Sequence, residues 1–359
     1  MTKQMFLFPQ EIISDTPESS LFPETETHSE VPTDEKWQRS IPAQVFLNHF
    51  FAIHYHIEHS HEAYQLYNLP HFLDFHPTMT ESEVAATRNL LVQSWSTEYA
   101  LRTTADLGDE EYLRNALHWT FPQAFYSMYL SIRAFLMTHG VTGNNEELVR
   151  REVGRLVVKG FYPLPVSFYA AGHYGDTSII KLPLAGYKAG LHLPTKALDA
   201  QAHIAQFLRT SRNLQAKAIK QRLQGNPQTA LRSQHTGEIL ENFSRKHWKQ
   251  VTWRIGYTTY FDLMKRLRIS AGYREIERFT QADIDFHLFH KSLLAIVSYL
   301  NFVHESYIAK AMGLEKYAEM VQQLPAYLKN GFVKQRFDDK IVPILHQAEL
   351  LKDNWLQAA

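Results

Sequence analysis

Apolar residues recur three and four positions apart through most of this 359-residue chain, with polar residues between them. This spacing places the apolar residues on one face of an α-helix. Helices are predicted at about 41–69, 80–104, 109–139, 144–159, 195–223, 281–312, 314–329 and 332–355. The stretch 232–272 is ambiguous, because Val251–Ile255 fits a strand as well as a helix. We therefore predict an all-α fold, or nearly so, in the form of a multi-helix bundle.

Capping and breaking residues indicate where some of these helices begin. Pro42 suits the first turn of a helix, where its missing N–H group is not needed. Thr80 with Glu83 three residues later has the pattern of a capping box. Pro122 should either kink its helix or open a new one that Thr120 caps.

Residues 160–195 interrupt the helical pattern with five glycines and four prolines. Such a segment is predicted to be an irregular insertion that holds a little β structure, and long loops in compact domains are often functional. The insertion divides one large predicted helical domain, residues 41–359, into an N-terminal half (41–159) and a C-terminal half (196–359).

Residues 1–40 differ from the rest of the chain in composition. They hold eight acidic side chains against three basic ones, together with four prolines. Prolines break helices, and unbalanced charge opposes collapse onto a core. We expect this stretch to be an acidic, disordered tail.

Composition narrows the class of protein. About 45% of the residues are apolar, enough for a sizeable core, and 37 basic residues balance 37 acidic ones. The absence of cysteine excludes disulfides, thiolate metal sites and a cysteine nucleophile. No secretory signal is recognised, and no apolar run approaches the roughly 18 residues of a membrane span. We expect a soluble, cytoplasmic protein that does not bind membranes.

The neutral total hides a basic middle, because residues 196–225 and 226–275 each carry a formal charge of +5. Four aromatic residues lie among these charges: Trp248, Trp253, Tyr257 and Tyr260. Cations interleaved with aromatic rings suit a phosphate backbone with stacked bases, so RNA or another nucleic acid is the expected partner. The candidate contacts are Arg209, Arg212, Lys217, Lys220, Arg245, Lys246, Lys249 and Arg254. The alternative is an ordinary solvated helix face.

Histidine is over-used, and seven of the 19 histidines lie between His49 and His76. On a continuous helix His54, Glu58 and His61 would share one face, and Glu58 with His61 has the Glu-x-x-His spacing of di-iron bundles. A divalent transition metal there would need ligands from other helices, for which the candidates are His287, His290, His304 and Glu305. The alternative is no cofactor and a polar face whose histidines bond to neighbours or water.

The stretch His118–His139 is apolar nearly all round, which predicts a helix in the middle of the bundle. Two parts of this stretch carry a recognisable pattern. Ala124–Met128 contains small and aromatic residues at helical spacing, and Arg133–Leu136 follows it, with Gly140 after the end of the helix. This stretch resembles the HEPN superfamily, small helical proteins of prokaryotic toxin and antiviral systems.

The resemblance implies metal-independent RNA cleavage by an arginine and a histidine that follows after four to six residues. Arg133 and His139 have five residues between them and satisfy this spacing. The histidine would take the proton of a ribose 2′-hydroxyl while the arginine stabilises charge on the phosphate. Members usually assemble such sites across a symmetric homodimer. The alternative is a structural arginine and a helix-end histidine stabilised by the helix dipole.

Three functions stay open at this point. The first is a HEPN-like protein that binds RNA and acts as a ribonuclease in toxicity or antiviral defence. The second is a metal-dependent helical-bundle enzyme that uses the His/Glu cluster. The third is a non-catalytic module that binds nucleic acid or a protein.

Overall fold

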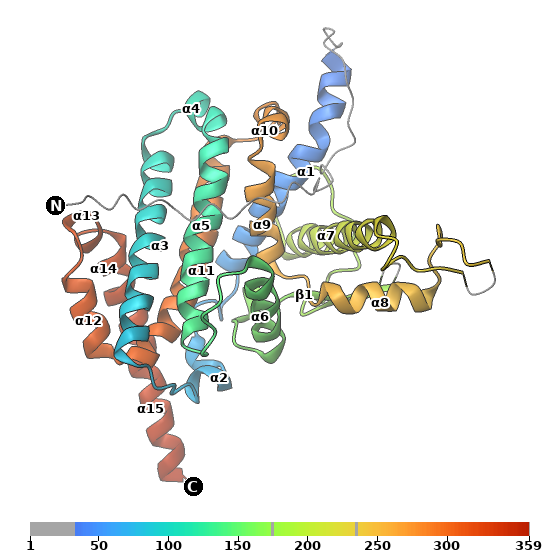
Figure 1. Ribbon diagram of the computed structural model, residues 1–359. Helices are drawn as coiled ribbons and strands as arrows, with labels where there is room; N and C mark the ends of the chain where they lie inside the picture. Colours follow the sequence, from blue (N-terminus) through green and yellow to red (C-terminus); the bar gives the residue numbers. More distant parts are fainter. Residues whose placement is uncertain (1–32, 174–175, 234–235, 359) are drawn as a thin grey trace, which may run out of the picture.

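Helices make up most of the chain in a computed structural model that describes residues 33–173, 176–233 and 236–358 (Figure 1). The predicted all-α bundle with a small β insertion is confirmed. Most of the predicted acidic tail lies outside the described residues. Its last part does not, because helix α1 spans Thr33–Glu58 and encloses Pro42. The prediction of a helix start at Pro42 is therefore wrong: the apolar anchors of α1 begin at Ala43, so the periodic pattern missed the preceding polar turns.

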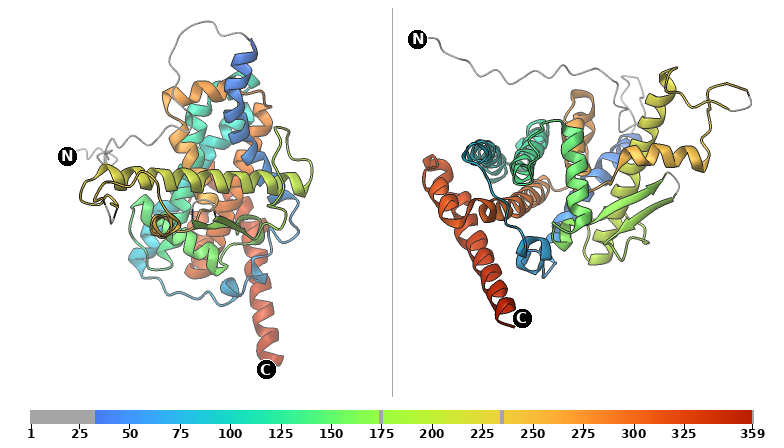
Figure 2. Two further views of the ribbon diagram at one scale, coloured as in Figure 1. Left: turned by 90° about the vertical axis from the view of Figure 1, so that its right-hand side faces the viewer. Right: turned by 60° about the horizontal axis from the view of Figure 1, so that its bottom comes forward.

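Three long helices form the centre of the molecule. They are α3 (Glu81–Leu107), α5 (Leu117–Met137) and α11 (Phe286–Met312). α3 packs along α5, and α11 packs against both, so that these helices run side by side (Figures 1 and 2). Of the described helices, α11 alone has the length and composition of a membrane span. Two-thirds of its most apolar 18-residue window (67%) is buried inside the bundle, as is usual for a core helix.

The other elements of the bundle surround this centre. The N-terminal half adds α2 (Pro70–Leu73), α4 (Glu110–Asn115) and α6 (Glu146–Lys159). The C-terminal half adds α9 (Tyr260–Ser270), α10 (Tyr273–Thr280), α12 (Leu314–Gln322), α13 (Ala326–Lys329), α14 (Phe332–Arg336) and α15 (Val342–Ala358). A π-helical turn, Phe337–Ile341, joins α14 to α15. Short 3-10 turns occur at Leu66–Asn68 and Leu164–Val166.

Local signals set some helix ends and not others. Thr80 caps α3, and the capping box with Glu83 is formed as predicted. Pro122 does not open a helix capped by Thr120 but lies inside α5, which begins after a break at Ala116. A proline leaves the carbonyl four residues earlier without its donor. That carbonyl belongs to His118, an exposed residue, where water can supply the hydrogen bond.

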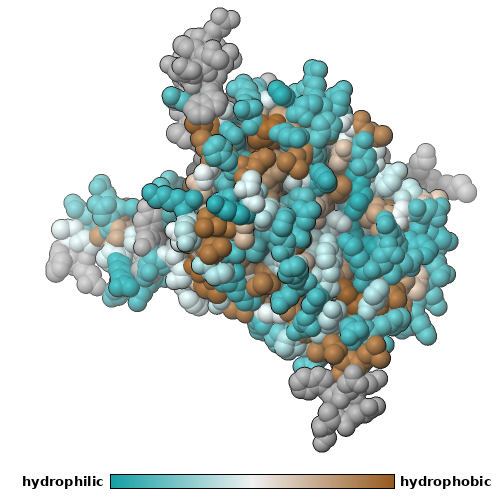
Figure 3. All heavy atoms as spheres, turned by 180° about the vertical axis from the view of Figure 1, so that it is seen from behind, coloured by the Kyte–Doolittle hydropathy of each residue, from teal (hydrophilic) through white to brown (hydrophobic). Residues whose placement is uncertain are grey.

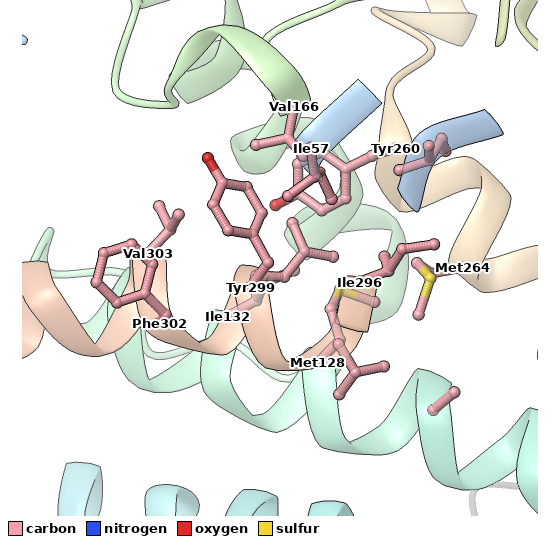
Figure 4. Packing of buried hydrophobic residues seen from close by; sticks show 14 of the residues in the cluster. Ile57, Met128, Ile132, Val166, Tyr260, Met264, Ile296, Tyr299, Phe302 and Val303 are labelled. Atoms are coloured by element: carbon pink, nitrogen blue, oxygen red, sulfur yellow. The ribbon is translucent and has the colours of Figure 1, made fainter. Parts of the chain in front are cut away.

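Apolar side chains from both halves of the chain meet in one large core. Figure 4 shows Ile57 of α1, Met128 and Ile132 of α5, and several residues of α11 converging, among them Ile296 and Tyr299. Each of these side chains is almost fully buried. Burying one large apolar side chain contributes about 1.5–3 kcal/mol, so the core residues drawn from distant segments hold the bundle together.

The predicted irregular insertion contains the one sheet among the described residues. Strand β1 (Tyr169–His173) pairs antiparallel with β2 (Asp176–Ile180), with Tyr169 opposite Ile180 and His173 opposite Asp176. Ala170 of β1 also forms an isolated bridge with Thr258, close to the start of α9. The hairpin therefore ties the insertion to the C-terminal half of the chain.

Two helices project beside the bundle as an arm (Figures 1 and 2). Helix α7 (Ala197–Gly225) packs its first half against α1, and α8 (Arg245–Ile255) packs on α7. Val251–Ile255, ambiguous in sequence, is helical. We use "the arm" for residues 211–233 and 236–255, which comprise the second half of α7, the connecting segment and α8.

Candidate nucleic-acid interface

A small apolar core of its own holds the arm together. It contains Ala216 and Leu223 of α7 with Val251 and Ile255 of α8, and Trp248 packs at its edge. On α8 the residues Trp248, Val251 and Ile255 fall on one side of the helix at 100° per residue. The opposite side of α8 is therefore free of this core.

Arg212 anchors the arm to the bundle. Its guanidinium donates to the carbonyl oxygens of Gly172 (2.7 and 2.9 Å), Ala170 (3.2 Å) and Gly256 (2.9 Å), and to Thr258 Oγ1 (3.1 Å). Burial lowers the pKa of Arg212 to about 10, so the group stays charged at neutral pH. Arg212 was predicted to contact nucleic acid, but the structure contradicts this. The residue is 2% exposed, and its guanidinium already donates to acceptors within the protein.

Other predicted contacts also serve the fold. Arg209 donates to the carbonyl of Ala185 at 2.6 Å. Lys220 donates to the carbonyl of Glu241 at 2.5 Å, and its ammonium lies 5.0 Å from the centroid of the Phe243 ring. Arg245 is exposed but forms an ion pair with Asp176 at 3.4 Å. These three side chains therefore have competing partners within the protein.

Three of the predicted lysines are left for a partner. Lys217, Lys246 and Lys249 are exposed, and none forms an ion pair or hydrogen bond with a residue that the structure describes. Arg222, also on α7, shares this situation and was not among the predicted contacts. Arg254 belongs to α8, but its side chain lies outside the described part of the chain.

The basic middle of the sequence therefore separates into two groups. In α9, Lys265 and Arg268 both pair with Glu146 of α6 at 2.9 Å and connect two helices of the bundle. In the arm, residues 211–255 carry nine basic side chains against two acidic ones. The arm therefore has an excess of positive charge, and Lys217, Arg222, Lys246 and Lys249 are its exposed cations without a described ion pair.

The four predicted stacking residues separate in the same way. Tyr260 is buried in the main core, Tyr257 packs edge-on against Tyr169 with ring centroids 5.5 Å apart, and Trp248 packs on Phe243. Trp253 is 88% exposed, the most exposed large apolar side chain in the described residues. Of these four residues Trp253 is the most exposed, followed by Tyr257 at 37%.

Lys246, Lys249 and Trp253 form a common surface, which we call the arm face. At 100° per residue the three positions fall within a sector of about 60° on the side of α8 opposite its apolar residues. Figure 3, which views the molecule from behind, shows the arm as a projection with many hydrophilic residues and scattered hydrophobic ones. An exposed indole one helical turn from an exposed ammonium group is an arrangement that can contact both a base and a phosphate.

The predicted catalytic pair is not brought together. Arg133 is half-buried on α5, and His139 lies beyond the end of that helix, with no contact joining the two side chains among the described residues. His139 Nδ1 lies 3.3 Å from the carbonyl of Phe135, and the ring packs against Phe75 and Phe161. Its Nε2 is buried without a described partner, and burial lowers its pKa. A nitrogen enclosed by aromatic rings cannot reach a ribose hydroxyl in this conformation.

The helix face predicted to bind metal is not formed. α1 ends at Glu58, so His61 lies in the following turn and does not continue the face of His54. The ring of His59 stacks on Tyr55 and its Nδ1 lies 3.0 Å from the Tyr55 carbonyl, which closes the helix end. His54 Nδ1 lies 2.9 Å from Ser292 Oγ. Within the described ranges no three histidine or carboxylate side chains gather as a metal site.

A buried ionic network that sequence reasoning missed joins α3, α11 and α14. Arg336 pairs with Glu98 and with Glu305, and all three side chains are at most 5% exposed. Trp95 Nε1 donates to Glu305 at 2.9 Å, and Asn301 Nδ2 donates to Glu98 at 2.8 Å. Glu305 was a candidate metal ligand, but its partners here are an arginine, an indole and a tyrosine.

The charges of this network compensate one another. Burial alone would raise the pKa of Glu98, but the guanidinium groups of Arg336 and Arg102 lower it to about 2. Burial raises the pKa of Glu305 despite the attraction of Arg336. Buried charges persist when they are paired and hydrogen-bonded, so this network is a structural clamp between the C-terminal helices and the centre of the bundle.

The network continues through neutral groups across the core. Ser131 Oγ lies 2.6 Å from Asn301 Oδ1 and 2.8 Å from His304 Nδ1. His304 Nε2 lies 3.0 Å from the hydroxyl of Tyr162. Burial lowers the pKa of His304 to about 3, so this predicted metal ligand is a neutral member of a hydrogen-bonded chain.

Comparisons with protein-family models, with curated proteins and with solved structures found no match for this chain.

Proposed function

We propose that this protein binds RNA through the arm face. The observation that carries the proposal is the position of Lys246 and Lys249, which are exposed on α8 and paired with no described carboxylate. Phosphate groups attract such lysines, and release of condensed counterions from the nucleic acid drives binding. Lys217 and Arg222 on α7 add positive charge to the same arm.

The proposal separates binding from catalysis. A HEPN-like relationship of α5 stays a hypothesis, supported by the sequence pattern at Ala124–Met128 and Arg133–Leu136. The ribonuclease role of Arg133 and His139 is not part of the proposal, because Nε2 of His139 is enclosed by aromatic rings. The arm face supports binding without requiring a nuclease site, a metal or a dimer.

Salt titration of RNA binding tests the proposal. The K246A/K249A variant should bind RNA more weakly at low salt than the unmodified protein. Its plot of log affinity against log salt concentration should be shallower by about 1.4, at about 0.7 for each lysine contact with a single strand. Fluorescence anisotropy with a labelled RNA measures both quantities.

The matched control is K188A/K316A, which removes the same charge from two exposed lysines outside the arm. This control should keep the affinity and the salt dependence of the unmodified protein. An equal loss in both variants would show that net charge, and not the arm face, governs binding. Absence of RNA binding by the unmodified protein at low salt would overturn the proposal.

A further inference from the structure

Trp253 has a surface position that neither folding nor packing explains. Trp253 is 88% exposed, against 37% for Tyr257, whereas Trp248 packs on Phe243. Exposed tryptophan is uncommon, because burying its large ring contributes strongly to stability. The ring lies one helical turn after Lys249 and two turns after Lys246 on the same side of α8.

We infer that the arm face recognises single-stranded RNA by stacking an unpaired base on Trp253, while Lys246 and Lys249 contact neighbouring phosphates. This inference rests on the proposed function and adds the class of RNA. From Lys246 to Trp253 the helix rises about 10 Å. Stacked nucleotides rise about 3.4 Å each, so the arm face matches a segment of about three nucleotides.

Base stacking on a protein ring favours single strands over duplexes. In an A-form duplex the bases are stacked on one another, and the readable groove exposes hydroxyls and base edges instead of ring faces. A single strand offers ring faces to any exposed aromatic side chain. Lysines alone would bind both forms, so Trp253 is the group that would distinguish them.

An exposed tryptophan beside lysines can also bind an anionic membrane surface. A helix that lies in a membrane interface inserts a continuous apolar face. The apolar residues of α8, Trp248, Val251 and Ile255, are packed against α7 in the small core. Trp253 is then an isolated aromatic residue among polar ones, which favours a nucleic acid over a lipid surface.

The test measures the affinities of W253A and W253F for a single-stranded RNA and for a duplex of the same length. W253A should bind the single strand roughly 5- to 150-fold more weakly, the range for loss of one stacked base. W253F should retain most of the affinity, and duplex binding should change in neither variant. Single-stranded DNA of the same sequence should show the same dependence, since stacking does not read the 2′-hydroxyl.

W119A is the matched control, because Trp119 is 66% exposed on α5, outside the arm. It should bind RNA as the unmodified protein does, and circular dichroism should show all these variants folded.

Full single-strand affinity in W253A, together with the loss expected for K246A/K249A, would overturn the stacking inference and leave the proposed function standing. Absence of binding to every nucleic acid would overturn both. Loss of binding to anionic phosphatidylserine vesicles in W253A, without loss of RNA binding, would assign the tryptophan to a membrane instead.

Discussion

The bundle and the arm place their charges in opposite ways. In the bundle Glu98, Glu305 and Arg336 are buried and paired with one another. In the arm Lys246 and Lys249 are exposed, and no described carboxylate pairs with them. A buried charge needs a partner inside the protein, whereas an exposed charge stays hydrated and can exchange water for an external ligand. The same residue types are therefore buried and paired in one region and exposed to solvent in the other.

The two regions also differ in how their helices are held. Side chains from most elements of the bundle meet in one continuous core. The arm has a core built mainly from Ala216, Leu223, Val251 and Ile255, and the multiple hydrogen bonds of Arg212 connect it to the bundle. A region with few buried apolar contacts opens more easily than a large core. We expect the arm to exchange its amide hydrogens faster than α5 and α11.

The largest effect expected from this comparison is in the bundle. R336M should lower the free energy of unfolding by about 3–5 kcal/mol, because it leaves Glu305 buried without its cation and leaves Glu98 with Arg102 alone. Denaturant unfolding followed by circular dichroism measures the change. E305Q, which keeps the shape and removes one charge, is the control and should have a smaller effect. A loss below about 1 kcal/mol in R336M would show that the network does not clamp the C-terminal helices.

A smaller effect is expected from acidification. Burial lowers the pKa of His304 to about 3, so the unfolded chain takes up a proton near pH 6.5 while the folded protein does not. The stabilisation is therefore complete above pH 6.5 and is lost as the pH falls towards 3, by about 1.4 kcal/mol per pH unit. Unfolding free energies at pH 6.5 and pH 5 should differ by about 2 kcal/mol from this residue.

The variant H304Q isolates that contribution, because other groups titrate in the same range. His49 and His139 also have pKa values lowered by burial, whereas burial raises the pKa of Glu305 and gives the opposite sign. H304Q should show a shallower dependence of stability on pH between 6.5 and 5. Parallel curves for H304Q and the unmodified protein would contradict the assignment of a neutral, buried His304.

The smallest effect on stability is expected in the arm face. K246A/K249A should change the free energy of unfolding by less than about 0.5 kcal/mol, because exposed, unpaired lysines contribute little to folding. The same variant should lose RNA affinity, so stability and binding respond separately. Thermal unfolding monitored alongside the binding assay checks this. Destabilisation comparable to that of R336M would place these lysines among the structural charges.

Local signals in the sequence predicted the parts of the fold that depend on neighbours along the chain. The capping box at Thr80 and Glu83 involves groups three residues apart, and it formed as expected. The Gly- and Pro-rich insertion at 160–195 could be located because these residues disfavour helix wherever they occur. The prediction of a metal-binding helix face with His54, Glu58 and His61 was wrong, because α1 ends at Glu58. The residue pattern does not show where this helix ends.

Periodicity and composition were sufficient to place this chain among helical bundles with an excess of positive charge in the middle. The roles of the individual charges depended on contacts between residues that are distant in sequence, 40 positions apart for Arg212 and Gly172. Arg336 meets Glu98 across 238 positions, a pairing that no local spacing encodes. Arg212 and Lys249 belong to the same basic stretch, yet packing buries the first against backbone carbonyls and leaves the second in water. Burial decides whether a charge serves the fold or a ligand, and burial is a property of the assembled helices.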